Sequence, residues 1–244
     1  MALAALIVIT ICCIAWSLWI RRVTWSCRWE VAATLNVALQ GLAVLLMSPL
    51  ASETLGQWLY SVTGTWNLED YIGHDCYIVA ASAIVYNALG RLQDDHSMQK
   101  TFKQYVERPA TLCIPALLVA FSLGNGARIY RPDFFQVPTD FWLSIYWLML
   151  CGMLIYLLGY GARALLVLRR DPRSRAIANV YLIASLSGIV ACAVRIATAY
   201  IPAFAEFEDG KAVWFFACMC GAVFAVAAAH SWRTKTKWFS RVTH

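Results

Sequence analysis

The chain has 244 residues, of which 61% are hydrophobic and only 14% are charged. A soluble domain does not normally carry several uninterrupted apolar runs of about 20 residues, the length that matches a hydrocarbon core of roughly 30 Å. The composition therefore excludes an ordinary soluble domain and predicts one all-α, polytopic membrane domain. The formal net charge of +6 does not indicate nucleic-acid binding, since attraction of basic loops to anionic lipid is a sufficient cause.

Apolar runs predict seven transmembrane helices. They are residues 2–20, 30–50, 70–90, 108–124, 140–167, 177–201 and 212–231. The first run has no basic segment before it and is followed by Arg21 and Arg22, which is the reverse of a cleaved secretory signal. We therefore expect residues 1–231 to form a single seven-helix transmembrane domain and residues 232–244 to form a basic cytoplasmic tail.

Basic residues are distributed unequally between the two sides of this bundle. Sixteen of the twenty Lys and Arg residues lie after the first, third, fifth or seventh helix, three lie in the opposite connections, and Arg195 lies within a helix. By the positive-inside rule, the N-terminus is outside and the C-terminus is cytoplasmic. The acidic residues on or near the outer side are Glu53, Glu69, Asp70, Asp75, Asp133, Asp140, Glu206, Glu208 and Asp209.

Polar residues concentrate at the start of the predicted third helix. Asn67 fits an N-cap, and Glu69 and Asp70 in the first turn complement the positive helix N-terminus. Asp70 and His74 are four residues apart and share a helix face. A hydrogen-bonded helix cap explains this cluster without further function, whereas a zinc or haem site needs additional ligands that the sequence does not place at the same depth. No cofactor or metal is predicted.

Arg195 lies about two turns inside the outer end of the predicted sixth helix, where a lone guanidinium costs at least about 2.5–3.5 kcal/mol. Asp75 is expected at a similar depth in the third helix, so it is the favoured partner, with His74 or Asp70 as the second choice. The alternative is that Arg195 snorkels unaided to the outer interface. The candidate polar site therefore comprises Asn67, Asp70, His74, Asp75 and Arg195.

Two further groups of side chains have structural interpretations. Asn36, Gln40 and Asn87 lie toward the inner side of the second and third helices, where buried amides usually bridge neighbouring helices. Trp147 and Trp214 fall in the outer parts of the fifth and seventh helices and are expected to anchor the bundle at the membrane interface.

The seven-helix plan and the motif Asn67-Leu68 through Gly73-His74 resemble uncharacterised seven-helix integral membrane proteins of actinobacteria and their phages. This resemblance implies a bacterial plasma membrane, or the membrane of a phage-infected host, and implies no activity.

Two classes of function remain open, and an enzyme is a third. The sequence favours a non-enzymatic sensing or interaction module in the lipid bilayer. This module would bind something at its outer acidic mouth, or a partner in the bilayer, and its basic inner loops would contact a membrane or cytoplasmic protein. The alternative is a small transporter or channel subunit with an outward-facing polar site between helices three and six. A haem or metal membrane enzyme is the least favoured. The charged connector at residues 91–108 is expected to be a solvated amphipathic segment.

Overall fold

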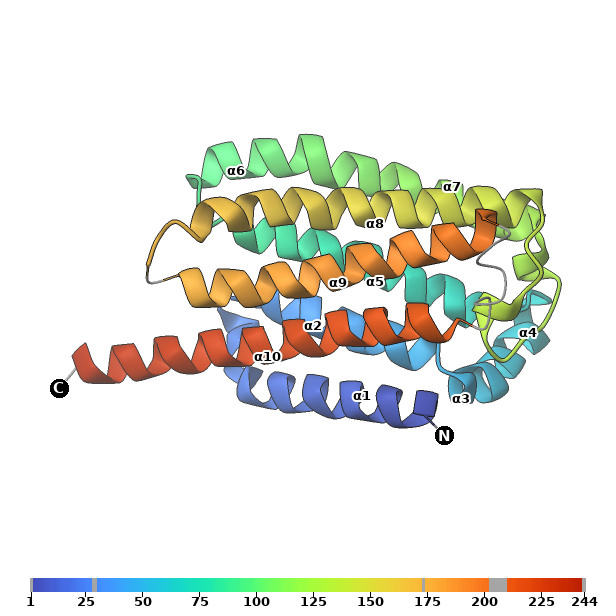
Figure 1. The fold of residues 1–244 in the computed structure, drawn as a ribbon, viewed down its shortest axis with the longest axis horizontal. Coiled ribbons are helices and arrows are strands. Elements are labelled where there is room, and N and C mark those ends of the chain that lie inside the picture. Colours follow the sequence, from blue (N-terminus) through green and yellow to red (C-terminus); the bar gives the residue numbers. More distant parts are fainter. Residues whose placement is uncertain (1, 28–29, 173, 202–209, 243–244) are drawn as a thin grey trace.

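The protein is a bundle of long helices that run roughly along one axis (Figure 1). The structure is a computed structural model that describes residues 2–27, 30–172, 174–201 and 210–242, with side chains of the last helix described only to residue 236. The long helices are α1 (Ala2–Ile20), α2 (Val31–Leu46), α5 (Leu68–Leu89), α7 (Arg108–Leu123), α8 (Phe141–Leu168), α9 (Arg175–Tyr200) and α10 (Lys211–Val242).

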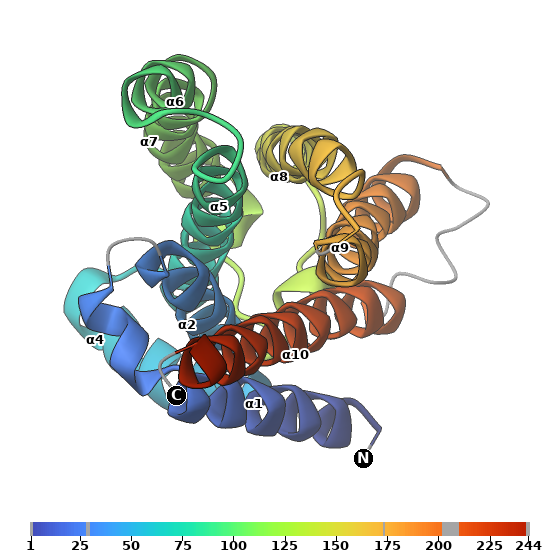
Figure 2. The ribbon, with the colours of Figure 1, turned by 90° about the vertical axis from the view of Figure 1, so that its left-hand side faces the viewer.

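Six of these helices form a closed ring. In chain order α1 contacts α2, α2 contacts α5, α5 contacts α8, α8 contacts α9, α9 contacts α10, and α10 returns to α1 (Figure 2). Helix α7 lies outside this ring, against α5 and α8. We call the end of the bundle that carries Arg21, Arg91 and Lys235 the basic end, and the end at which α5 begins the acidic end.

Several of the described helices have the length and apolar composition needed to cross a membrane. Five helical segments qualify, namely α1, residues 95–123, α8, α9 and the first part of α10, and a sixth is obtained if a bent pair that begins with α2 is counted as one span. Helix α5 is not among them, because polar side chains such as His74, Asp75 and Asn87 interrupt its 22 residues. The fold is therefore an all-α bundle compatible with a membrane, and a seventh span depends on counting α5.

The predicted second helix, residues 30–50, is wrong at its end. Helix α2 stops at Leu46, and the chain bends by 61° before a second helical segment, Pro49–Thr63. This segment comprises α3 (Pro49–Ala51), the π-helical turn η2 (Ser52–Gly56) and α4 (Gln57–Thr63). Ser48 has an extended backbone, which proline imposes on the residue before it, and the Ser48 side chain accepts a hydrogen bond from the Ala51 amide. The helical run therefore breaks where the proline begins a new one.

The connector at residues 91–108 is amphipathic and mostly exposed, as expected, and from Asp95 onward it is helical. Helix α6 (Asp95–Phe102) continues through the π-helical turn η3 (Lys103–Glu107) into α7. The Asp94 carboxylate caps α6 by accepting a hydrogen bond from the Ser97 amide. Met98 and Val106 are buried against the bundle, so this charged segment has one apolar face.

The segment from residue 232, which we expected to be a tail, continues α10 as a helix to Val242. Residues 243 and 244 lie outside the described part of the chain, as do Arg28, Arg173, Glu206, Glu208 and Asp209, which contributed to the charge asymmetry.

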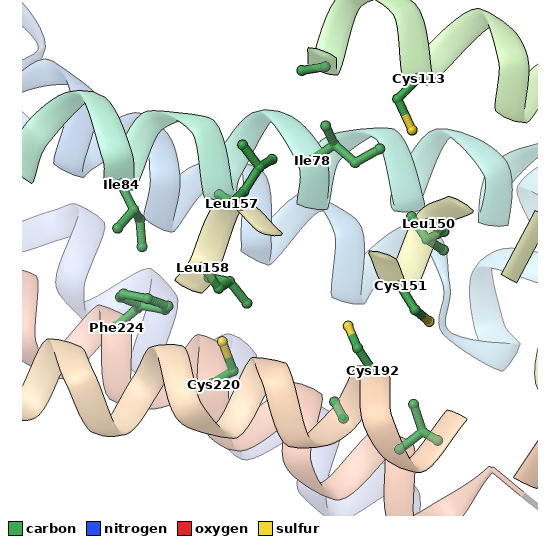
Figure 3. Close-up of a cluster of buried hydrophobic side chains, with 14 of the residues drawn as sticks. Ile78, Ile84, Cys113, Leu150, Cys151, Leu157, Leu158, Cys192, Cys220 and Phe224 are labelled. Atoms are coloured by element: carbon green, nitrogen blue, oxygen red, sulfur yellow. The ribbon is translucent and has the colours of Figure 1, made fainter. Parts of the chain in front are cut away.

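The interior of the ring is filled by apolar side chains and by cysteine thiols. Figure 3 shows Leu157 and Leu158 of α8 facing Ile78 and Ile84 of α5 and Phe224 of α10. Contacts of this kind bury apolar surface from every helix of the ring in one cluster around α5 and α8, to which α1 contributes Ile7. These contacts fix the positions of the polar side chains described next.

Candidate functional site

Asn67 holds the loop that follows α7 onto the start of α5. Its side-chain amide donates hydrogen bonds to the carbonyl oxygens of Gly126, at 2.6 Å, and Ile129, at 2.9 Å. The expected side-chain N-cap is wrong: Asn67 occupies the cap position with a left-handed backbone, φ 56°, and its side chain makes no capping hydrogen bond. Asparagine tolerates this backbone conformation better than most residues, which leaves its side chain available for the neighbouring loop.

The two acidic residues of the first turn of α5 are both buried. Glu69 packs against the bent segment so closely that a Cβ atom on Gly56 would lie 2.5 Å from its Oε1 atom. The Glu69 and Asp70 side chains therefore belong to the packed acidic end of the bundle and do not form an open acidic mouth.

His74 lies among aromatic rings between α5 and α8. Its Nδ1 atom is 2.8 Å from the Tyr146 hydroxyl oxygen, and its ring lies 5.3 Å from the Trp147 ring and 5.6 Å from the Phe134 ring. This hydrogen bond fixes the orientation of the imidazole, because a buried ring nitrogen without a partner costs about 1–3 kcal/mol.

Arg195 of α9 shares this aromatic surface with His74. The guanidinium carbon lies 4.2 Å from the centre of the Trp147 ring and 5.6 Å from the centre of the Phe135 ring. A cation over an indole face in a dry site gains about 2 kcal/mol or more. Trp147 thus contacts both the imidazole of His74 and the guanidinium of Arg195.

Asp75, the partner favoured by the sequence, lies on a different face of α5. Its neighbours are Tyr71 and, on α7, Cys113. His74 and Asp75 are consecutive, so about 100° of helix rotation separates them, and only one can face the interior of the ring. The residue of α5 that lies beside Arg195 is therefore His74, the second choice.

A narrow cavity extends from His74 and Arg195 along the inside of the ring. It has a volume of about 80 Å³ and is bounded by α2, α5, α8, α9 and α10. Its walls are mainly apolar and include Leu150, Leu154 and Leu158 of α8. Figure 3 shows Cys151 of α8 and Cys192 of α9 pointing toward one another across this region, with Cys220 of α10 near Leu158. We call this space the central cavity.

Several uncharged side chains that line the central cavity have a buried polar atom without a hydrogen bond. These atoms are the indole Nε1 atoms of Trp147 and Trp214 and the amide oxygen of Gln40. The two tryptophans are only 1% and 2% exposed, so neither is the interfacial anchor expected from the sequence. Most buried polar groups in native proteins have a partner, and an orphan often marks the place of a bound molecule or water.

The amides of α2 and α5 have separate environments. Asn36 donates to the carbonyl oxygen of Ala80 at 2.9 Å and so joins α2 to α5, and Gln40 donates to the Asn36 side chain at 3.3 Å. Asn87 does not join this pair, because it lines a second cavity at the basic end.

A buried ionic cluster at the basic end was not anticipated from the sequence. The Arg21 guanidinium has no exposed surface and donates to Thr34, to the Ala228 carbonyl and to the Glu30 carboxylate. The other carboxylate oxygen of Glu30 accepts a hydrogen bond from Lys235. Burial raises the pKa of Glu30, but hydrogen bonds and charges from Lys235 and Arg21 outweigh burial and bring the pKa below its ordinary value.

No family model, curated protein or solved structure matches this chain. Within the described part of the chain, no three His, Cys, Asp or Glu side chains are grouped as metal ligands would be.

Proposed function

We propose that the protein is a non-enzymatic membrane module that binds a small, mostly apolar molecule in the central cavity and so senses it. The observation that supports this proposal is that Trp147 and Trp214 line the cavity and that both of their buried indole N–H groups lack an acceptor. A molecule with acceptor oxygens at this end of the cavity would supply what these donors lack.

The walls of the cavity define the remaining chemistry of the ligand. Leucine, alanine and cysteine side chains favour a narrow apolar body, and the Arg195 guanidinium favours a carbonyl or carboxylate group over a cationic one. Gln40 supplies a single acceptor at the far end of the cavity. A slender apolar molecule with one oxygen-bearing head group fits these features.

The proposal includes a number of membrane spans and an orientation in the membrane. Counting α5 and the bent α2 segment gives seven spans, with the N-terminus outside and the C-terminus in the cytoplasm of a bacterial cell, or of its host if the chain is encoded by a phage. The excess of basic residues at one end supports this orientation. In this arrangement the basic end faces anionic lipid and is available to a membrane or cytoplasmic protein partner.

Tryptophan-to-phenylalanine variants test ligand binding. Trp147→Phe and Trp214→Phe keep an aromatic ring in the wall but remove the indole donor. Because one hydrogen bond contributes about 1 kcal/mol to the free energy of binding, we expect each variant to retain several-fold less ligand. The measurement is mass spectrometry of small molecules extracted from purified protein, expressed per mole of protein.

Trp142→Phe is the matched control, because Trp142 lies on the same helix, α8, and is 37% exposed. The ligand is the species that is depleted in both cavity variants and not in this control. Equal amounts of every extracted species in all three variants and the wild type would contradict the proposal.

A transporter is the second candidate, because two cavities lie at different depths between the same four helices, α5, α8, α9 and α10. The layer between them contains Ile84, Gly161, Ala184 and Phe224, all of them buried. This layer is apolar and closes the central cavity toward the basic end, so transport would require it to open.

Thiol labelling separates the two candidates. In a variant that retains Cys220 as its single cysteine, we expect a membrane-impermeant maleimide to label less than about a tenth of the protein from either side, because Cys220 is buried in the closed cavity. Unfolding in detergent supplies the full-labelling control. Extensive labelling from the basic side would instead establish a conducting path and favour the transporter.

A further inference from the structure

A larger cavity opens at the basic end of the bundle. Its volume is about 1010 Å³, and it lies between the ends of α5, α8, α9 and α10. Figure 2 shows this end of the bundle facing the viewer, with α8 and α9 on one side and α5 on the other. We call it the basal cavity.

The wall of the basal cavity has two kinds of surface. Polar groups come from Asn87 and Arg91, in and just after α5, and from Ser231 and Lys235 of α10. The remaining wall is largely apolar and includes Ala88, Leu165, Leu168, Ile177, Ala178 and Trp232. A charged head group and the first carbons of a hydrocarbon chain could both be accommodated.

The charges around the basal cavity do not balance. Glu30 is the only acidic residue in its described wall, and it is shared by three cations. One carboxylate oxygen bonds to Arg21, whereas the other bonds to Lys235 and lies 4.0 Å from Arg91. Because Arg21 and Glu30 neutralise each other, two positive charges remain at the wall of a partly enclosed space.

We propose that the basal cavity binds a phosphate-bearing anion. Arg91 and Lys235 supply the charge, and Asn87 and Ser231 supply neutral hydrogen-bond donors, which together match the several acceptor oxygens of a phosphate. Basic cavities between helices at a membrane surface favour anionic lipid head groups. This site is separate from the central cavity and does not depend on a ligand being bound there.

The phosphate can belong to a lipid head group or to a soluble compound, and the two sources are distinguished by the choice of probe. The protein in neutral detergent is titrated with short-chain phosphatidylglycerol, with phosphatidylcholine and with inorganic phosphate, and binding is measured by native mass spectrometry and by the midpoint of thermal unfolding. Binding of phosphatidylglycerol alone identifies a lipid site, whereas an effect of inorganic phosphate at a similar concentration identifies a soluble source. Both results support the proposal, and absence of binding by both anions overturns it.

The variant that tests the charges is Arg91→Gln combined with Lys235→Gln, which leaves Arg21 paired with Glu30. Each basic residue near an anionic membrane component contributes about 1 kcal/mol, so we expect the anion to bind roughly 10- to 30-fold more weakly. The matched control is Arg169→Gln with Arg170→Gln, because both residues are exposed at the same end and do not line the cavity. An equal loss in both double variants would mean a general surface effect and would overturn the site.

A second variant tests the space and leaves every charge in place. Ala178 is 3% exposed and lines the basal cavity, so Ala178→Trp places a bulky side chain where the ligand would lie. We expect at least a tenfold loss of phosphatidylglycerol or phosphate binding in this variant. Unchanged binding by a folded Ala178→Trp protein would exclude the basal cavity as the binding site. If that variant does not fold, the comparison of the two double charge variants tests the site.

Discussion

Replacing Arg21 with methionine is expected to lower the free energy of unfolding by about 3–5 kcal/mol, the range found when one partner of a buried ion pair is removed. Arg21 is completely buried, and its guanidinium donates to groups near the start of α2 and on α10. Methionine fills similar space but removes the Arg21 hydrogen bonds to the Oε2 atom of Glu30 and to the Ala228 carbonyl. Denaturant or thermal unfolding in detergent micelles measures the loss.

Arg22→Met is the matched control for this prediction. Arg22 is the next residue, is exposed, and lies over the Trp19 ring at 4.9 Å. An exposed cation–π contact contributes about 0.5–1 kcal/mol, so the control should lose no more than that. Similar decreases in the free energy of unfolding of the two variants would mean that Arg21 contributes no more than an exposed arginine, and would contradict the buried ionic cluster.

A double variant shows whether the destabilisation comes from the buried Glu30 carboxylate, which has lost its buried partner Arg21. In Arg21→Met/Glu30→Leu the buried charge that Arg21 compensated is also removed, so the double variant should be at least as stable as Arg21→Met alone. Lys235 and Arg91 lose their partner as well, but their side chains are 37% and 29% exposed, and water can solvate them. Additive losses from the two substitutions would show that the ion pair does not couple them.

The contrast between Arg21 and Arg22 shows what hydropathy can and cannot predict. The apolar run from Ala2 to Ile20 defines α1 to the residue, because length and apolarity are local properties of the sequence. The direction of the next two side chains depends on helix rotation and on the short helical turn after Arg21, and neither changes the hydropathy. Glu30 is the one acidic residue in its part of the sequence, and that isolation is the signal that could have identified a buried partner.

In the candidate site, too, the sequence predicts which residues are unusual but not which way their side chains point. Polar residues at the start of α5 and Arg195 in α9 were identified because charged residues within apolar segments are uncommon. Choosing between His74 and Asp75 as the neighbour of Arg195 required the rotation of α5 about its axis. The sequence does not define this rotation, because the face of α5 that carries His74 packs in the ring and the face that carries Asp75 packs against α7. Trp147 and Trp214 resemble interfacial anchors in sequence, since depth along a helix does not reveal whether an indole faces lipid or the interior.

Filling the central cavity is expected to have the largest effect on ligand binding. Gly188 of α9 faces it, and a Cβ atom there would lie 2.7 Å from the Leu158 Cδ1 atom and 3.1 Å from the Cys220 sulfur. The leucine side chain in Gly188→Leu can extend only into the space that the ligand occupies. We expect retention of the extracted ligand to fall at least tenfold, with overpacking costing about 1–3 kcal/mol of stability.

A graded series distinguishes displacement of the ligand from general loss of stability. Gly188→Ala adds one methyl group, which the flexible end of Leu158 can accommodate, so retention should fall less than in Gly188→Leu. Gly159→Leu on α8 makes the same substitution at a position with no atom within 4 Å of the added Cβ, and it should leave retention unchanged. If retention follows the unfolding midpoint across all three variants, the loss is one of folding. If it follows the volume added at residue 188, the ligand lies in the central cavity, because only there does the added side chain compete with it for space.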